Sequence, residues 1–329
     1  NNGTGGTTTG GVIVVKEGNL NISMNSMSPA NLSSVPKAGS VKFATVDFTA
    51  GSKDITVNAV TLKRSGLGNT SDIDRVYFEK DGIRVSSRSS VSSDQTVTLS
   101  FAPAWVIKAG TTDSIDLYVD MNATSVGGEH MFQSTSVDSS AANVVGMITT
   151  PTLRTADYTV SNVTITSAGA GLTATANDAT DLELGQFKLT DSSVGADERD
   201  LMFKSVTFRQ DGDGDLTSLS NVGLYRNGVK VSTVTVMNGK DLTFGLGNGN
   251  EIKDGQTANY YIRGSVNYVD GVNGDTYNFR LRNTSDLNVI EETTSFRASI
   301  TGTPTLSTYT VNGADVQFRR DTAFALSNS

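Results

Sequence analysis

The chain has 329 residues, which is enough for two domains of ordinary size that each bury a core. Its net charge is −8 at pH 7 and no basic stretch is interleaved with aromatics, so we expect no nucleic-acid partner. Cysteine is absent, which excludes disulfides and thiolate metal sites, and no apolar run is long enough to predict a membrane span.

The first residues, 1–11, are rich in Gly and Thr and are typical of a flexible linker or arm. No signal peptide and no initiator Met are present, so we interpret the chain as a processed product or a fragment of a longer one. Short apolar segments then predict strands over Val12–Lys16 and Leu20–Met24, and the alternation in Val41–Phe48 predicts another.

A long stretch occurs twice: Val60–Ser86 aligns without a gap with Val206–Ser232, at an offset of 146 residues. Two of the shared positions are the glycine pairs Gly66/Gly212 and Gly68/Gly214. Self-similarity at a fixed period indicates tandem modules. We therefore divide the chain into a linker or arm (1–11), a first module (12–150), a second module (151–303) and a C-terminal extra strand (304–329).

Both modules interrupt one strand at the same place. The apolar alternation slips by one residue between Ala59 and Val60, and again between Ser205 and Val206. A slip of one residue at equivalent positions predicts a β-bulge in each copy.

Both modules also carry a tight-turn signal shortly afterwards. Asp81-Gly82 and Asn227-Gly228 each lie between two apolar segments. These dipeptides tolerate the positive φ of a type I′ turn, so we predict a two-residue β-hairpin in each module.

No window of eleven or more residues has a convincing helical period. Each module instead offers about seven to nine alternating segments with frequent turn signals. This pattern predicts an all-β protein of two tandem Ig-like antiparallel β-sandwich domains with short linker strands, and a β-barrel is the alternative.

The end of the chain predicts an unpaired strand. The joint Thr150–Leu153 recurs as Thr303–Leu306, after which Tyr309–Phe318 would begin a third module. Such a strand could be the stub of a longer array, fold back on the second module, or join the sheet of another subunit. The last option makes four residues candidate assembly residues: Tyr309, Val311, Val316 and Phe318.

Six stretches of the first module have a familiar sequence: Gly18–Ser23, Ser28–Ala30, Phe43–Ala50, Asp54–Leu62, Ser71–Phe78 and Ile107–Thr112. With these stretches the module resembles repeats of large S-layer-like and stalk-like surface proteins of candidate-phylum (ultra-small) bacteria. The resemblance implies secretion and a place in a surface layer, appendage or adhesin, and it supplies no catalytic residues.

One polar motif could hold a metal. Asp211, Asp213 and Asp215 alternate with glycine, as oxygen ligands for Ca²⁺ do in wrapped loops, although the EF-hand pattern fails at Leu216 and Val222. A solvated acidic turn is the competing interpretation. A second acidic group, which could add ligands, consists of Asp197, Glu198 and Asp200.

Catalysis is not indicated. His130 is the only histidine, no G-x-S-x-G motif accompanies it, and we expect it on a loop or in solvent. Trp105, the only tryptophan, is expected in the core or at the module junction, and one ring of Tyr260-Tyr261 is expected to face solvent or a neighbour.

Several Asn residues match the N-x-[ST] pattern, which arises by chance in a chain rich in Asn, Ser and Thr. The candidate N-glycosylation sites are Asn21, Asn31, Asn69, Asn122, Asn162 and Asn283.

We expect a non-enzymatic, extracellular or cell-surface structural protein. It would self-assemble into a filament, sheath or surface layer, joined by strand donation through the C-terminal segment, with Val12–Met24 as a second candidate for a donated strand. The alternative is a non-catalytic adhesin or stalk fragment that binds a glycan or protein ligand.

Overall fold

The computed structural model describes residues 16–122, 127–158, 160–169, 172–175, 182–193, 199–266 and 274–312. Within these ranges the regular structure is β-strand apart from three 3-10 turns, η1 (Thr70–Asp72), η2 (Leu216–Ser218) and η3 (Thr284–Asp286). No helix in the described part of the chain is long and apolar enough to cross a bilayer.

The first module, module 1, is a sandwich of two sheets. A six-stranded sheet has the order β10-β1-β3-β8-β5-β6, and a five-stranded sheet has the order β2-β11-β9-β4-β7. The strands are β1 (Asn19–Met24), β2 (Ser34–Pro36), β3 (Gly39–Ala50), β4 (Ile55–Ser65), β5 (Ile73–Lys80), β6 (Ile83–Arg84), β7 (Thr96–Ile107), β8 (Thr112–Met121), β9 (Glu129–Ser139), β10 (Asn143–Val145) and β11 (Leu153–Ala156).

The second module, module 2, repeats this plan, but the long strand β17 pairs with both β16 and β18 and so joins the two sheets. The joined sheet has the order β21-β15-β18-β17-β16-β19-β14-β12-β23, with β22 also on β15, and a small sheet has the order β13-β24-β20. The strands are β12 (Asn162–Ala168), β13 (Leu172–Thr175), β14 (Leu182–Asp191), β15 (Leu201–Gln210), β16 (Leu219–Arg226), β17 (Val229–Asn238), β18 (Asp241–Ile252), β19 (Thr257–Val266), β20 (Thr276–Tyr277), β21 (Phe279–Arg280), β22 (Leu287–Glu291), β23 (Ser299–Thr301) and β24 (Tyr309–Asn312).

The predicted bulges are present in both modules. The pairing register of β4 shifts between Val57 and Ala59, and that of β15 shifts between Phe203 and Ser205. The extra residue in each strand returns the following apolar side chains to the core, because side chains alternate along a strand. Val60 and its counterpart Val206 are accordingly fully buried.

The predicted hairpins are confirmed as well. Asp81 and Gly82 have φ of 52° and 78°, and Asn227 and Gly228 have φ of 50° and 78°. Positive φ at both central residues is the requirement of a type I′ turn, which Asp-Gly and Asn-Gly meet with little strain.

Each module ends in a strand that lies beyond the predicted boundary. β11 pairs in parallel with β2, and β24 pairs in parallel with β13. Module 1 therefore extends past residue 150 to Ala156, and Tyr309–Asn312 close module 2 instead of starting a third module. The boundaries were predicted too early because the Thr-Pro-Thr-Leu joint leads into the last strand of each module and does not follow it: Leu153 begins β11, and Leu306 lies three residues before β24.

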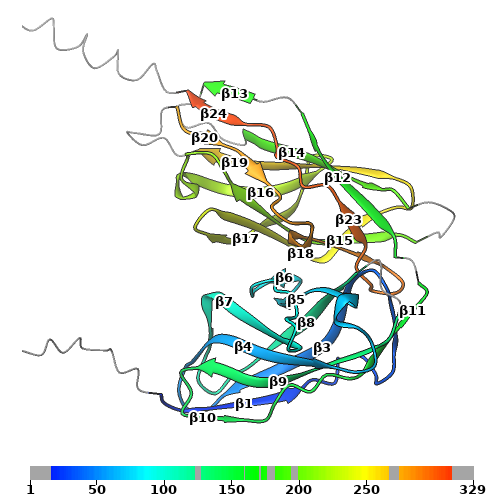
Figure 1. The fold of residues 1–329 in the computed structure, drawn as a ribbon. Helices are drawn as coiled ribbons and strands as arrows, with labels where there is room; N and C mark the ends of the chain where they lie inside the picture. Colours follow the sequence, from blue (N-terminus) through cyan, green and yellow to red (C-terminus); the bar gives the residue numbers. More distant parts are fainter. Residues whose placement is uncertain are drawn as a thin grey trace, which may run out of the picture.

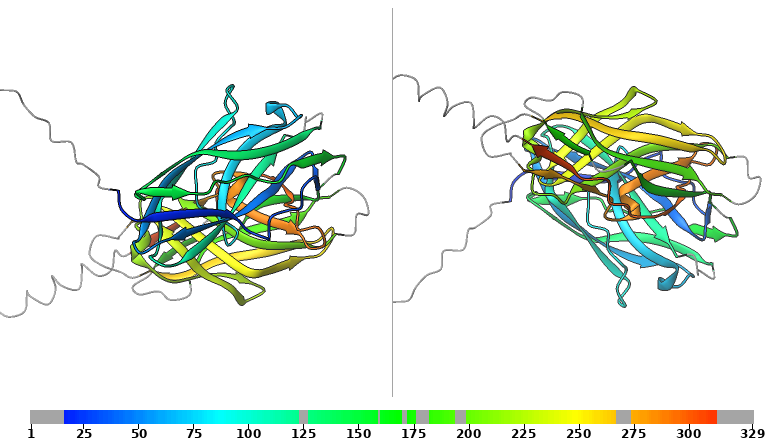
Figure 2. Two further views of the ribbon diagram at one scale, coloured as in Figure 1. Left: turned by 90° about the horizontal axis from the view of Figure 1, so that it is seen from below. Right: turned by 90° about the horizontal axis from the view of Figure 1, so that it is seen from above.

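The two modules have separate hydrophobic cores, one built around Phe43, Phe48 and Phe132 and the other around Phe187, Phe203 and Tyr260. Figure 1 shows the two sandwiches stacked, with β5 and β6 of module 1 facing β15 and β18 of module 2. β1 and β10 lie at the end of module 1 that is remote from module 2 (Figures 1 and 2).

Candidate functional site

The junction between the modules begins at the β5–β6 hairpin of module 1. The backbone carbonyl of Gly82 accepts hydrogen bonds from Ser205 Oγ at 2.6 Å and from Asn288 Nδ2 at 3.2 Å. The side chain of Arg84 then pairs with Asp286, with 2.6 Å between Nη2 and Oδ1. The tip of one hairpin is thus held by β15, η3 and β22 of the other module.

A buried charge lies beside this tip. Arg297 of module 2 is 3% exposed and donates hydrogen bonds to Glu79 and, at 2.9 Å, to the Tyr77 hydroxyl. Its guanidinium also covers the Tyr118 ring, 4.4 Å from the centroid. Arginine suits this position because its flat cation can bind a carboxylate and lie on an aromatic face at the same time.

Further polar groups of module 1 support the rings that hold Arg297. The Tyr77 hydroxyl is 3.1 Å from Asp120 Oδ1, and Arg88 Nε donates to Asp120 Oδ2 at 2.7 Å. Burial raises the pKa of Glu79, and the Arg297 cation limits that rise. Burial opposes the charge on Arg297, but Glu79 and the tyrosines more than offset it and raise the pKa of Arg297. Removing one partner of such a pair leaves an uncompensated buried charge, which costs about 3–5 kcal/mol.

A cleft of about 810 Å³ opens beside the junction, between β7 of module 1 and β17 and β18 of module 2. Its walls are largely apolar, and Val106, Val236 and Met237 are each at least 40% exposed. Trp105 lines the cleft and also packs on Phe48, with ring centroids 5.0 Å apart. Trp105 therefore lies both against the core of module 1 and beside the junction, the two positions that were expected for it.

The glycines of the loop with the Asp-Gly repeats allow its backbone to approach a neighbouring strand closely. A Cβ on Gly66 would lie 2.2 Å from the carbonyl oxygen of Glu129, and a Cβ on Gly212 would lie 2.1 Å from that of Thr276. We call each of these loops, residues 64–72 and 210–218, a glycine latch. In both latches the first side chain bonds the second glycine carbonyl: Arg64 donates to Gly68, and Gln210 donates to Gly214 at 3.0 Å.

The three carboxylates predicted to bind Ca²⁺ each have another partner. Asp211 binds Arg280, Asp213 accepts from Thr276, and Asp215 accepts from the backbone of Thr217 at 2.9 Å. Among the described residues, Asp211, Asp213 and Asp215 do not form a group whose oxygens converge within 4.8 Å. Calcium binding at these residues stays a prediction.

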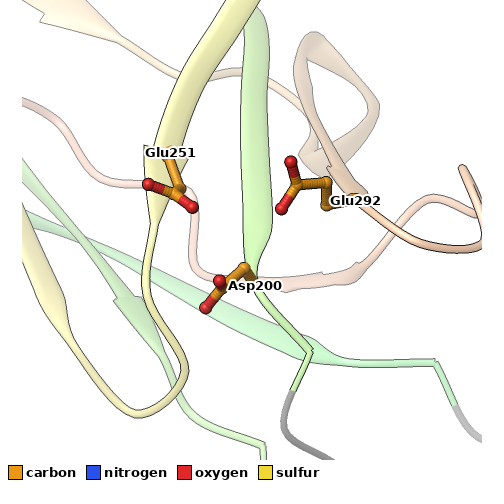
Figure 3. A group of neighbouring side chains, drawn as sticks. All are labelled: Asp200, Glu251 and Glu292. Carbon is orange, nitrogen blue, oxygen red and sulfur yellow. The ribbon is translucent and has the colours of Figure 1, made fainter.

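A different acidic group does converge. Asp200, Glu251 and Glu292 bring carboxylate oxygens within 4.8 Å of one another (Figure 3). The ammonium group of Lys253 contacts both Asp200, at 2.7 Å, and Glu251, and its hydrogen bond is the main cause that lowers the pKa of Asp200. Asp200 was part of the second predicted acidic group, whose other members, Asp197 and Glu198, lie outside the described residues.

His130 is fully buried on β9, so the expectation of a loop or solvent position is wrong. Its Nδ1 accepts from Arg64 Nη2 at 2.9 Å, and its Nε2 lies 3.4 Å from Asp72 Oδ2. Burial, together with the Arg64 cation, lowers the pKa of His130 to about 4. The ring is a neutral packing element of the latch in module 1.

Two of the four candidate assembly residues, Tyr309 and Val311, lie at the end of the described chain. Tyr309 is 2% exposed, and its strand β24 pairs with β13 and β20 of the same module. Of the three outcomes considered for this strand, Tyr309–Asn312 adopt the fold-back. Val311 lies on β24, while Val316 and Phe318 lie outside the described residues.

The sequon asparagines are accessible in varying degree. Asn21, Asn31, Asn69 and Asn283 are exposed, and Asn122 and Asn162 are partly exposed. Of the tyrosine pair, Tyr260 is fully buried and Tyr261 is partly exposed, as the alternation predicts.

No family model matches the sequence, and no curated protein matches it. Solved structures with some similarity include a type I cohesin from Pseudobacteroides cellulosolvens, at 14% identity over 43% of this chain and 94% of the cohesin, with a TM-score of 0.25. The C-terminal domain of the Streptococcus agalactiae AgI/II polypeptide BspA is 10% identical over 88% of this chain and 99% of that domain, with a TM-score of 0.22. The fibronectin(III)-like modules of Clostridium thermocellum CbhA are 9% identical over 90% and 96%, with a TM-score of 0.18. These scores are too low to support any argument, and the fold class rests on the strand pairing described above.

Proposed function

We propose that this chain is an extracellular structural protein whose rigid pair of sandwiches is the building unit of a filament, sheath or surface layer. The observation that carries the proposal is the junction at Arg297, where a buried ion pair and two hydrogen bonds to Gly82 join the modules. Domains in one chain usually move relative to each other. A buried, directional contact instead fixes one orientation, which an assembling subunit needs.

The chemistry of the described residues also favours a structural role. His130 is buried and neutral, and two of the three converging carboxylates, Asp200 and Glu251, are bound by Lys253. A catalytic site needs a polar group that can reach substrate. Buried His130 cannot act in this way, and we propose a non-catalytic protein.

The proposal includes strand donation through the C-terminal segment, but only through the residues that follow Asn312. Tyr309–Asn312 already pair within module 2, so their donation would require exchange of an intrachain strand. The residues that follow, including Val316 and Phe318, are the remaining candidates for a donated strand.

An adhesin is the second candidate, and the cleft beside Trp105 favours it. A largely apolar cleft of about 810 Å³ between two modules has the size and the wall chemistry of a ligand site. In that case the modules would hold a protein or glycan ligand between them.

Negative-stain electron microscopy of the purified chain, beside a version that lacks residues 313–329, tests the proposal. This truncation keeps β24, so module 2 retains its closing strand. Polymers from the full chain support the structural role, and monomers from the truncated chain would assign assembly to the deleted segment. A full chain that stays monomeric at every concentration and salt tested would overturn the proposal and favour the adhesin.

A further inference from the structure

The junction inside the chain is built from two different surfaces. We call the β5–β6 hairpin with its neighbour β8 the hairpin face of module 1. The other side is the bend surface of module 2, formed by η3, β22 and the segment that leads into β23. Because the modules are repeats, each surface has a second copy: module 2 has a hairpin face on β16, β17 and β19, and module 1 has a bend surface on β9 and β10.

The other module covers the hairpin face of module 1, whereas the hairpin face of module 2 is exposed. A Cβ at Gly82 would meet Asn288 at 3.1 Å, whereas a Cβ at its counterpart Gly228 has no atom within 4 Å. The next residue, Val229, is 64% exposed. At the position of Arg84 stands Lys230, which is also exposed.

The chemistry of this open face differs from its covered counterpart. Tyr225 replaces Glu79, and Arg263 replaces Tyr118. The Arg263 guanidinium lies over the Tyr225 ring at 5.4 Å, and the Lys230 ammonium lies near the same ring at 5.5 Å. The open hairpin face is therefore aromatic and positively charged.

Strand pairing locates the bend surface of module 1. β10 pairs in parallel with β1, as β23 does with β12. Asp138 pairs with Ala59, as Asn288 pairs with Ser205, so Asp138 occupies the position of Asn288. Ala141 precedes β10 by two residues, as Arg297 precedes β23.

This bend surface carries one exposed carboxylate and is partly apolar. Asp138 is exposed, and Val144, Val145 and Met147 are 41%, 60% and 52% exposed. In Figure 1 it lies at the end of module 1 remote from module 2. Within one chain it therefore cannot reach the open hairpin face.

The two open surfaces are complementary with the charges exchanged. In the covered junction the carboxylate of Glu79 is on the hairpin face and the cation of Arg297 is on the bend surface. In the open pair the exposed cation of Lys230 is on the hairpin face and the carboxylate of Asp138 is on the bend surface. Two open hairpin faces would repel each other, so the charges favour contact between unlike surfaces.

We propose that the open hairpin face of module 2 binds the bend surface of module 1 of a second copy of this chain. The contact repeats the internal junction between molecules, and it rests on the proposed structural function. A contact between unlike surfaces leaves a free surface at each end, so it continues as an open fibre when the rotation between successive copies does not close a ring.

Charge reversal tests the proposal by light scattering and sedimentation of the full chain over a concentration series. Lys230→Glu and Asp138→Lys should each raise the concentration needed for assembly at least about tenfold, because each places like charges in contact. An equimolar mixture of the two variants should assemble again, since the contacts in an alternating fibre then join opposite charges. Lys63→Glu, an exposed change on β4 outside both surfaces, should assemble like the unchanged chain.

The outcomes separate this inference from the function on which it rests. If the unchanged chain polymerises and the two variants polymerise equally well, the surfaces assigned here are wrong while the structural function stands. If each variant fails and the mixture fails too, the charge pairing is overturned. If the unchanged chain never assembles, both proposals fall.

Discussion

Module 1 and module 2 share a glycine latch and a hairpin, but they give them different surroundings. The latch of module 1 encloses Arg64, His130 and Asp72, whereas module 2 uses the neutral Gln210 at the position of Arg64. The hairpin of module 1 is covered and that of module 2 is open. The backbone plan is therefore fixed by glycines and bulges, and the side chains around it are free to take separate roles.

The largest effect should come from the covered hairpin. Arg297→Met leaves Glu79 buried without its cation, and we expect a loss of about 3–5 kcal/mol in the free energy of unfolding, measured by urea denaturation. The two modules should also lose their fixed orientation, which small-angle X-ray scattering would detect as a larger radius of gyration.

Lys230→Met is the matched control, because Lys230 belongs to the open hairpin face and should cost about 0.5 kcal/mol or less. The double variant Arg297→Met with Glu79→Met should recover a large part of the loss, since no unpaired charge remains buried. Equal stability of Arg297→Met and Lys230→Met would show that the buried pair does not couple the modules.

A somewhat smaller effect should show that the two latches are equivalent. Gly66→Ala and Gly212→Ala each force a methyl group against a backbone carbonyl at about 2 Å, and we expect each to destabilise its own module by about 3 kcal/mol. Thermal unfolding followed by calorimetry would measure both changes.

Gly110→Ala and Gly255→Ala provide the control pair. Both control glycines have positive φ, of 71° and 67°, as Gly66 does and Gly212 does not, but no atom lies within 4 Å of an added Cβ. They should cost only about 1 kcal/mol, the strain of the backbone alone. If all four variants cost the same, close approach is not what keeps glycine in the latch.

The repeat made much of the fold predictable. The slip at Ala59 and Ser205 and the Asp-Gly and Asn-Gly turns recur at one offset, and recurrence separates a structural signal from chance. The same comparison applies to the Asp-Gly loop: Gly212 and Gly214 recur in module 1 while the three aspartates do not. The glycines, and not the carboxylates, were the repeated feature, and the structure gives them their reason.

The junction could not be predicted in the same way. Arg297 and Asp286 lie more than 200 residues from their partners Glu79 and Arg84, and Ala141 occupies the position of Arg297 in module 1. Nothing periodic marks them. The sequence also did not predict that His130 is buried. Its burial depends on the latch of module 1, which folds over β9, and not on the alternation of residues along β9.

The smallest expected effect is a dependence of stability on pH that arises from the latch of module 1, through His130. The pKa of His130 is about 4 in the folded chain, against 6.5 for an unperturbed histidine, so the unfolded chain binds this proton first as pH falls. The stability that neutral His130 provides is therefore fully present above pH 6.5 and is lost as pH falls toward 4. We expect this loss to reach about 2 kcal/mol.

Urea denaturation at pH 7.5 and pH 4.5 would measure the loss, with His130→Gln as the comparison. Carboxylates titrate in both proteins, so the difference between the two pH dependences isolates the single histidine. The His130→Gln chain should lose about 2 kcal/mol less than the unchanged chain over this interval, whatever its stability at pH 7.5. The latch of module 2 contains aspartates but no histidine, and it is identical in the two proteins, so it contributes equally to both pH dependences. Equal pH dependence of the two proteins would mean that His130 takes up its proton without leaving the latch, and the presence of a histidine in only one of the two latches would then have no consequence for stability.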